Sequence, residues 1–307
     1  MVLLCGIPGD KPFEMIADAL DKIGSPYIIL NQQQFLNMEI CCAVTNKGFN
    51  GELRIGNDLY PLQNFSGVYN RMVGWQELPS LKEASPAEQE HCANFHELLF
   101  NWLEIAECRV MNTNSAMSSN CSKPYQSIAI AKMGFKIPAT LITNEPGAVA
   151  GFYTDKKTVI FKSISGVRSI VHELEPVALA RLPMIQTCPT MFQEKLTGNN
   201  LRVHVVGEKC FAHFVTSDIV DYRYAATKGG TANIEAYELD DEIEKACIGL
   251  SKELRLPLAG IDLFVTTQRE YYCFEVNPSP GYSYYQHATG QDIAGAIARW
   301  LYYGTAK

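Results

Sequence analysis

Two polar side chains stand out at the end of an otherwise apolar stretch near the C-terminus. The run YYCFEVN covers residues 271–277 and stops at Pro278, which favours a strand that ends in a turn. Side chains alternate along a strand, so Glu275 and Asn277 share one face. An acid and an amide on the same face can supply oxygen ligands to a cation.

A third oxygen donor reaches the same face if the two preceding stretches form a hairpin. Residues 259–267 read AGIDLFVTT, and a symmetric turn centred on residues 268–269 places Asp262 directly opposite Glu275. Carboxylates that face each other across a ladder repel unless positive charge lies between them. Asp262, Glu275 and Asn277 therefore suit Mg²⁺, which takes its other ligands from water and phosphates. Two readings stay open: a solvated sheet face, or the acid/base pair of a hydrolase.

Basic residues elsewhere in the chain could meet an anionic ligand. Lys162 ends the apolar run TVIFKS and precedes a loop of small residues, so it could hold a phosphate. Lys123 lies beside a predicted helix start, and Arg202 alternates with apolar residues in LRVHVV. Each has an ordinary alternative as a solvent-facing residue. Neither a P-loop nor a dinucleotide-binding glycine motif follows a strand.

Composition excludes several classes of protein. The 307 residues are 47% hydrophobic and 19% charged, as in an ordinary globular protein of two or three subdomains. A formal net charge of -7 argues against nucleic-acid binding, and no apolar run is long enough to cross a membrane. The N-terminal stretch lacks the features of a signal peptide, so we expect a cytoplasmic protein without a membrane partner. A homo-oligomer is left open.

The ten cysteines are expected to be thiols, because a chain of this length without a secretion signal seldom carries disulfides. The segment HCANFH places Cys92 between His91 and His96. No second cluster completes four ligands, so we favour thiols over a zinc site.

Periodicity divides the chain into an α/β part and an α+β part. Strands are predicted at 2–7, 27–31 and 66–72, with helices at 8–24 and 88–107, as in an open α/β domain that ends near residue 112. The second part contains predicted helices at 122–134 and 240–256 and strands at 158–163, 191–196, 201–215, 258–266 and 270–277. The predicted domains are 1–112 and 113–307, with subdomains of about 113–190 and 191–307.

The order of these pieces resembles the ATP-grasp superfamily, particularly RimK-type ligases. The segments that carry the resemblance are SKPYQSIAIAKMGFKIPAT, IFKSISG, MFQEKLTGNNLRVHVVG and AGIDLFV with FEVNPSPG. It implies a Rossmann-like N-terminal domain followed by central and C-terminal subdomains with ATP between them. It also implies roles at the following positions: Lys123 and Lys162 at the ATP phosphates, Gln193, Glu194, Lys195 and Leu196 at adenine, Asp262, Glu275 and Asn277 at Mg²⁺, and Arg202 in catalysis.

Further residues are assigned to substrate binding. VDYRYAATKGGTAN resembles the RimK-type stretch that places Asp221, Arg223, Lys228 and Gly230 near substrate. Arg71 is added because its guanidinium could clamp a carboxylate, although an arginine at a strand end commonly forms a surface ion pair. One departure from the RimK-type pattern is Asn200, where the family usually has an acid.

The chain is also similar to ATP-grasp ligases that build microviridin-type peptides. SGVYNRM, NEPGAVAGF and CPTMFQEK carry this second resemblance. In those enzymes a hairpin after the lysine strand grips a leader peptide, whereas the corresponding residues 164–183 look shorter here.

The sequence thus predicts an ATP- and Mg²⁺-dependent carboxylate–amine ligase that acts through an acyl phosphate on a small amino-acid-like molecule or a peptide. Lys162 and Arg202 are the predicted catalytic residues. The alternatives are a macrocyclase of ribosomal peptides, a kinase or hydrolase, and an ATP-binding regulatory module without turnover.

Overall fold

A parallel sheet organises the N-terminal part of the computed structural model, which describes residues 1–46, 48–164, 170–217 and 231–306. The strand order is β2-β1-β6-β7, and all neighbours run parallel. Its elements are β1 (Val2–Gly6), α1 (Lys11–Lys22), β2 (Tyr27–Asn31), β6 (Gly67–Asn70), α2 (Pro86–Ile105) and β7 (Arg109–Met111). The predicted α/β arrangement of this part is confirmed.

A second, antiparallel sheet in this part was not predicted. It has the order β3-β4-β5 and comprises β3 (Met38–Thr45), β4 (Gly48–Ile55) and β5 (Asp58–Pro61). Its buried residues Met38 and Leu53 join the core beneath α2, together with Trp102. Short 3₁₀ helices connect the elements: η1 (Gln32–Asn37), η2 (Leu62–Asn64), η3 (Trp75–Glu77) and η4 (Pro79–Leu81).

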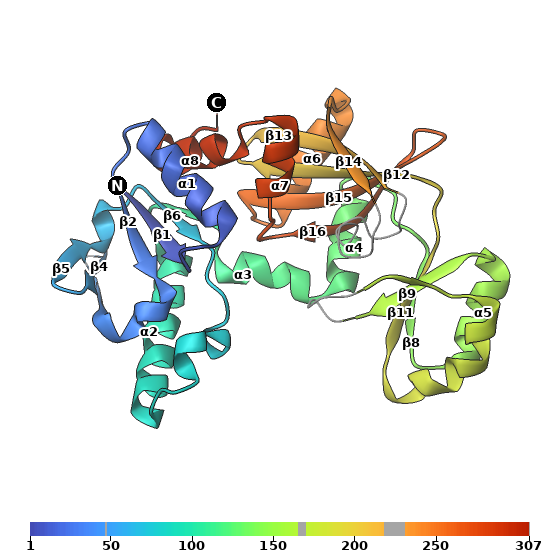
Figure 1. Cartoon of the computed structure of the whole chain (residues 1–307), viewed down its shortest axis with the longest axis horizontal. Coiled ribbons are helices and arrows are strands. Elements are labelled where there is room, and N and C mark those ends of the chain that lie inside the picture. Colours follow the sequence, from blue (N-terminus) through green and yellow to red (C-terminus); the bar gives the residue numbers. More distant parts are fainter. Residues whose placement is uncertain (47, 165–169, 218–230, 307) are drawn as a thin grey trace.

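The last helix of the chain completes the N-terminal core. In Figure 1, α8 (Ile293–Tyr303) lies beside α1, although the two are at opposite ends of the sequence. Ile297 and Leu301 of α8 are fully buried in one cluster with Leu4 and Phe13. Arg109 donates hydrogen bonds to the carbonyls of Leu301 and Tyr302 at 2.8 to 3.2 Å, which fastens this helix to β7.

The central part is a small four-stranded sheet of order β10-β9-β11-β8. Its elements are β8 (Thr140–Thr143), α5 (Pro146–Lys156), β9 (Val159–Ser163), β10 (His172–Glu173), η6 (Pro176–Thr187) and β11 (Thr190–Glu194). Val149 of α5, Leu182 of η6 and Phe192 of β11 form its core. In Figure 1 this lobe lies apart from the N-terminal sheet, on the other side of the C-terminal sheet.

The C-terminal part is built on a five-stranded antiparallel sheet of order β14-β13-β12-β15-β16. Its strands are β12 (Gly198–Val206), β13 (Lys209–Ser217), β14 (Ala232–Tyr237), β15 (Leu258–Thr266) and β16 (Tyr271–Asn277). The associated helices are α3 (Asn114–Met117), η5 (Ser118–Cys121), α4 (Lys123–Lys132), α6 (Asp241–Glu253) and α7 (Ser283–Thr289). Val203 and Ile261 of the sheet pack with Ile130 of α4 and Leu250 of α6. The predicted α+β class is confirmed.

The hairpin of β15 and β16 pairs the two acids as predicted, but its turn differs from the predicted one. Asp262 faces Glu275, as the symmetric register requires, but Leu263 faces Cys273, because a β-bulge shifts the ladder by one residue. The turn is therefore not the predicted tight one. The Thr266 N–H bonds to the Glu270 carbonyl at 3.0 Å, and Arg269 takes a positive φ of 60° inside the loop.

Candidate active site

A row of charged side chains crosses three strands of the C-terminal sheet. Arg202 on β12 pairs with Asp262 on β15, which in turn pairs with Glu275 on β16. The Arg202 guanidinium donates to the Asp262 carboxylate, and the Lys123 ammonium donates to Glu275 Oε2 at 3.0 Å. We call these four side chains the charge row. Each carboxylate has a cationic neighbour, so the like charges predicted to repel are compensated.

The helix that supplies Lys123 is fastened to the strand that supplies Glu275. Ser122 caps α4 by accepting a hydrogen bond from the Tyr125 N–H. One turn on, the buried Gln126 side chain donates to the Val276 carbonyl at 2.7 Å and accepts from its N–H at 3.1 Å. These two bonds occupy the outer edge of β16 and fix the first turn of α4 over it. Lys123 is thereby directed at the carboxylate.

The donor set fits a divalent cation. Asp262 and Glu275 keep 22% of their side-chain surface exposed, whereas Arg202 and Lys123 keep only 7% and 10%. The carboxylates are therefore the accessible members of the row. Asn277 follows on the same face, and its Oδ1 accepts the Ser279 N–H at 2.9 Å, which orients the amide oxygen. The described residues contain no group of three or more His, Cys, Asp or Glu side chains that could hold a metal, and this set is two acids and an amide.

Gly260 makes room for the guanidinium of the charge row. It lies opposite both His204 and Asn277 in the ladder, one step along the face from Arg202. A Cβ at Gly260 would overlap the Arg202 guanidinium and come within 2.7 Å of the Pro280 side chain. A glycine is thus required for Arg202 to lie flat against the sheet beside the predicted metal ligands.

Sequence reasoning missed a cluster of three aromatic rings beside Arg202, called the aromatic floor below. The rings of His204, His213 and Tyr285 pack against one another with centroids 4.9 to 5.2 Å apart. Both histidines are fully buried, and burial lowers the pKa of His213 to about 4 and that of His204 well below its usual range. Neutral rings are therefore placed beside the guanidinium. The alternation in LRVHVV could have placed His204 on the face of Arg202.

The residues of the central sheet that are predicted to contact the nucleotide do not lie side by side across adjacent strands. Lys162 on β9 pairs with Met191 on β11, so it shares a face with Gln193 two residues further on. The Gln193 amide donates to the Thr140 hydroxyl at 3.0 Å. Phe192, which lies between Met191 and Gln193 on β11, faces the other side of the sheet and belongs to the core there.

The remaining predicted adenine contacts lie at and just beyond the end of β11. Glu194 accepts the Ala139 N–H at 2.8 Å, and Lys195 donates to Glu173 at 2.5 Å. Leu196 follows the strand and is half-buried.

The predicted substrate residues are divided between two places. Arg71 ends near the predicted metal ligands: it forms an ion pair with Asp10 and donates to Ser279 Oγ and the Pro280 carbonyl, each at 3.3 Å. The other predicted residues, Asp221, Arg223, Lys228 and Gly230, lie outside the described residues. Asn200, the departure from the RimK-type pattern, lies on β12 two residues before Arg202 and is half-buried.

The cysteines do not take part in the charge row. All ten are free thiols, and burial, followed by the negative charges of Asp262 and Glu275, raises the pKa of Cys273 well above its usual value. In the segment HCANFH, the buried His96 ring nitrogen lies 2.7 Å from the Cys92 carbonyl within α2. These contacts favour structural thiols at both places.

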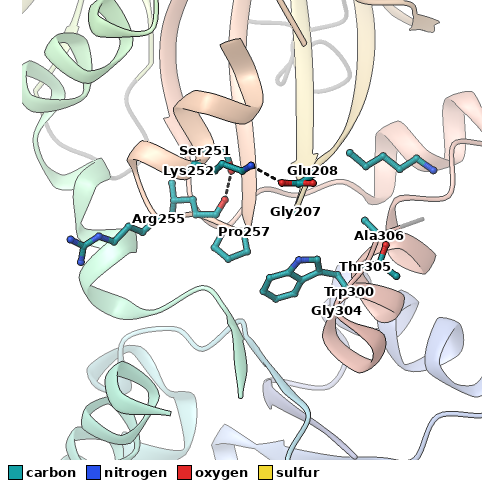
Figure 2. A pocket seen from close by; sticks show the side chains of 12 residues that line it. Gly207, Glu208, Ser251, Lys252, Arg255, Pro257, Trp300, Gly304, Thr305 and Ala306 are labelled. Atoms are coloured by element: carbon teal, nitrogen blue, oxygen red, sulfur yellow. Dashed lines mark hydrogen bonds and ion pairs between the residues drawn. The ribbon is translucent and has the colours of Figure 1, made fainter. Parts of the chain in front are cut away.

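A separate cavity of about 520 Å³ lies beside the turn between β12 and β13, with Gly207 and Pro257 in its lining. Figure 2 shows Trp300 facing Pro257 across it, while Lys252 reaches Glu208 at 2.6 Å above them. The charge row is not part of the lining of this cavity.

Comparison with known proteins identifies the family and the fold of the chain. The RimK-like ATP-grasp domain matches residues 122–301. A probable alpha-L-glutamate ligase 2 of Shewanella sp. (strain MR-4) is 23% identical over 256 residues, which cover 78% of this chain and 85% of the relative. The relative is named as a ligase, in line with the predicted enzyme class. No helix among the described residues is both long and apolar enough to cross a membrane.

Solved structures show the same fold over almost the whole chain. A RiPP-associated ATP-grasp ligase of Chryseobacterium gregarium, in complex with ADP and a leader and core peptide, has a TM-score of 0.83 and 22% identity and covers 98% of this chain and 96% of its own. The macrocyclase MdnC of Microcystis aeruginosa MRC, bound with precursor peptide MdnA, has a TM-score of 0.81 and 22% identity, with 98% of each chain covered. The predicted ATP-grasp fold is confirmed. Because the matching domain spans more than half of the sequence, the chain belongs to the RimK-like ATP-grasp family of ligases.

Proposed function

We propose that this protein joins a carboxylate to an amine at the expense of ATP, with ADP and phosphate as the other products. The observation that carries the proposal is the charge row. It brings two carboxylates, a guanidinium and an ammonium together on one sheet face, with Asn277 beside them. Such a mixed row suits a reaction in which charge on phosphates must be held and redistributed.

The first step transfers the terminal phosphoryl group of ATP to the substrate carboxylate, which gives an acyl phosphate and ADP. Asp262, Glu275 and Asn277 are the residues that would hold Mg²⁺, and the ion would neutralise charge on the phosphates. Lys123 and Lys162 would contact phosphate oxygens as point charges. Gln193, Glu194, Lys195 and Leu196 would line the adenine pocket.

The second step is attack of the amine on the acyl phosphate, which forms the amide and releases phosphate. Arg202 would stabilise the developing negative charge, since its guanidinium is fixed on the sheet by Asp262 and Gly260. Arg71 and the predicted residues Asp221, Arg223 and Lys228 would bind the substrate. No nucleophilic side chain is needed, which agrees with the raised pKa of the Cys273 thiol.

A second candidate is the modification of a peptide within its own chain, through ester or amide cross-links. It is favoured by the likeness to the two solved peptide-bound ligases, which extends over nearly every residue. Among the described residues between β9 and β11, only β10 pairs back with β9, over two residue pairs: His172 with Phe161 and Glu173 with Ile160. We therefore retain a small amino-acid-like molecule or a free peptide end as the preferred substrate.

The two candidates differ in the mass of their product. The purified protein is screened for phosphate release with ATP, Mg²⁺ and either pairs of amino acids and dipeptides or precursor peptides that carry a leader. A small-substrate ligase yields ADP, phosphate and a product one water lighter than two molecules combined. A cross-linking enzyme yields one peptide that has itself lost water. ADP together with a phosphorylated substrate and no ligated product would favour a kinase, and release of ADP and phosphate with neither product would favour a hydrolase. Either result would contradict ligation.

A further inference from the structure

One buried asparagine connects the N-terminal domain to the hairpin of β15 and β16, which carries the two acids of the charge row. Asn112 follows β7 and keeps only 1% of its surface exposed. Its side-chain amide donates to the Leu258 carbonyl at 2.7 Å and to the Pro278 carbonyl at 2.6 Å. Its side-chain oxygen accepts the Leu258 N–H at 3.1 Å. Both donor hydrogens and the acceptor oxygen of one side chain are thus engaged.

These bonds replace the backbone hydrogen bonds that β15 and β16 do not make with each other at this point. The β15–β16 ladder ends at the pair of Gly260 and Asn277. The next backbone groups belong to Leu258 and to Pro278, which has no N–H to offer. Asn112 inserts its amide between the two strands, donating to one carbonyl on each and satisfying the Leu258 N–H as a backbone amide would. The ladder is thereby held closed one step beyond Asn277.

Asn112 is itself fixed from the N-terminal domain. The Asn70 side chain at the end of β6 donates to the Asn112 carbonyl at 2.9 Å. Two residues after Asn277, the Ser279 N–H donates to the amide oxygen of Asn277, and Arg71 donates to Ser279 Oγ. Hence the backbone immediately after Asn277 is tethered at Pro278 by Asn112 and at Ser279 by Arg71.

We propose that Asn112 is a positioning residue for the metal ligand Asn277. Its bond to the Pro278 carbonyl sets where β16 ends, and therefore where the amide oxygen of Asn277 lies relative to Asp262 and Glu275. The inference rests on the metal site of the proposed function. It extends that site into the N-terminal domain, which contributes none of the metal ligands.

The test compares two substitutions of Asn112 with a substitution of Arg109, which lies on β7 and makes the same number of side-chain hydrogen bonds. Asn112→Ala removes all three bonds, and Asn112→Asp keeps the volume and the acceptor for Leu258 but loses both amide donors. Arg109→Met is the control, because Arg109 donates three hydrogen bonds from the end of the N-terminal sheet, to the Leu301 and Tyr302 carbonyls of α8. Mn²⁺ affinity of the ADP complex is measured by electron paramagnetic resonance, with thermal unfolding measured in parallel.

We expect both Asn112 variants to bind Mn²⁺ about tenfold more weakly in the ADP complex, the effect of roughly one lost hydrogen bond to the ligand-bearing segment. The KM for Mg²⁺ should rise with little change in kcat at saturating metal. Arg109→Met should lower the unfolding temperature comparably and leave metal affinity within about twofold of wild type.

Two results would overturn the inference. Unchanged Mn²⁺ affinity in Asn112→Asp, or an equal loss in Arg109→Met, would show that Asn112 acts on stability alone. Glu275→Gln separates this failure from a failure of the proposed function. If that variant loses metal and Asn112→Asp does not, only the positioning role is wrong. If Glu275→Gln also keeps full metal affinity, the ion is held elsewhere and the metal site fails with it.

Discussion

The C-terminal and central sheets carry the two halves of the candidate site in different ways. In the C-terminal sheet, Arg202, Asp262 and Glu275 are direct partners on adjacent strands, so one face displays them together. In the central sheet, Lys162 and Gln193 share a face, while the neighbouring Phe192 faces the other way and Lys195 bonds to Glu173 beyond the strand end. A ladder fixes the first group, whereas local contacts fix the second.

The difference indicates where substitutions should be most damaging. In the charge row, each side chain compensates the charge of a neighbour. Removing one charge therefore leaves a partly buried neighbour without its partner. In the central sheet, the side chains of Gln193, Glu194 and Lys195 have separate partners, so a loss there should stay local. The predictions below test this contrast.

The largest effect is expected for Glu275→Gln, which removes a charged ligand from the predicted metal site and the partner of Lys123. We expect ligation to fall by about 10² to 10⁴ while the protein stays folded, since transition-state charge on the phosphates loses its support. Glu270→Gln is the control, because Glu270 lies at the turn of the same hairpin and pairs with Lys136 at the surface. Near-wild-type turnover of folded Glu275→Gln would remove the charge row from the mechanism.

A smaller effect is expected in the central sheet. Lys162→Ala should weaken ATP binding by about tenfold and lower ligation, because an ammonium against phosphate has no backbone substitute. Calorimetry with ATP measures this, with Lys245→Ala on the exposed side of α6 as the control. Unchanged ATP affinity together with unchanged turnover would return Lys162 to a solvent-facing role.

The charge row also predicts a gain of binding. Lys123 compensates the charge of Glu275 at 3.0 Å, so Lys123→Met should leave that carboxylate more attractive to a cation. We expect Mn²⁺ to bind the nucleotide-free variant about fivefold more tightly, while ATP affinity falls. Lys132→Met, at the other end of α4, should change neither. Weaker metal binding to nucleotide-free Lys123→Met would show that the ion pair does not compete with the metal.

The smallest effect concerns pH and the aromatic floor. Burial lowers the pKa of His213 from 6.5 to about 4, so the unfolded chain binds a proton there before the native protein does. The contribution of His213 to the free energy of unfolding is therefore constant above pH 6.5. As the pH falls from 6.5 to 4, this contribution decreases by about 1.4 kcal/mol per pH unit. Urea unfolding of wild type and His213→Phe at pH 7 and 5.5 measures this. An equal pH dependence in both proteins would contradict a neutral buried His213.

Strand alternation predicted the charge row better than it predicted the turn beside it. Asp262 and Glu275 pair as expected, but the bulge and the longer loop at Arg269 are invisible to a rule that counts residues symmetrically. The face of Lys162 follows the same alternation. The predicted adenine contacts rest only on the resemblance, and for Lys195 and Leu196 strand periodicity gives no guide, because residues 195–197 lie outside the strand.

Other features depend on contacts that are distant in sequence. Asn112 bonds to Leu258 and Pro278, which lie 146 and 166 residues further along the chain, and no local pattern announces such a partner. The antiparallel sheet of β3 to β5 was missed because its strands bury few apolar side chains and carry many polar ones. In β4, for example, only Gly51 and Leu53 are buried. Likewise, α8 packs in the core of the N-terminal domain, although it lies at the other end of the sequence, so its position in the chain does not predict this contact.

The most direct test of the central claim is a crystal structure of the protein with ADP and Mn²⁺, in which anomalous scattering locates the metal. The account predicts an ion bound to oxygens of Asp262, Glu275 and Asn277 at about 2.1 Å, with the nucleotide phosphates completing its coordination. Lys123 should then have left Glu275 for a phosphate oxygen. An ion bound to other residues, with the Lys123–Glu275 pair still intact, would contradict the claim that the charge row forms the catalytic metal site.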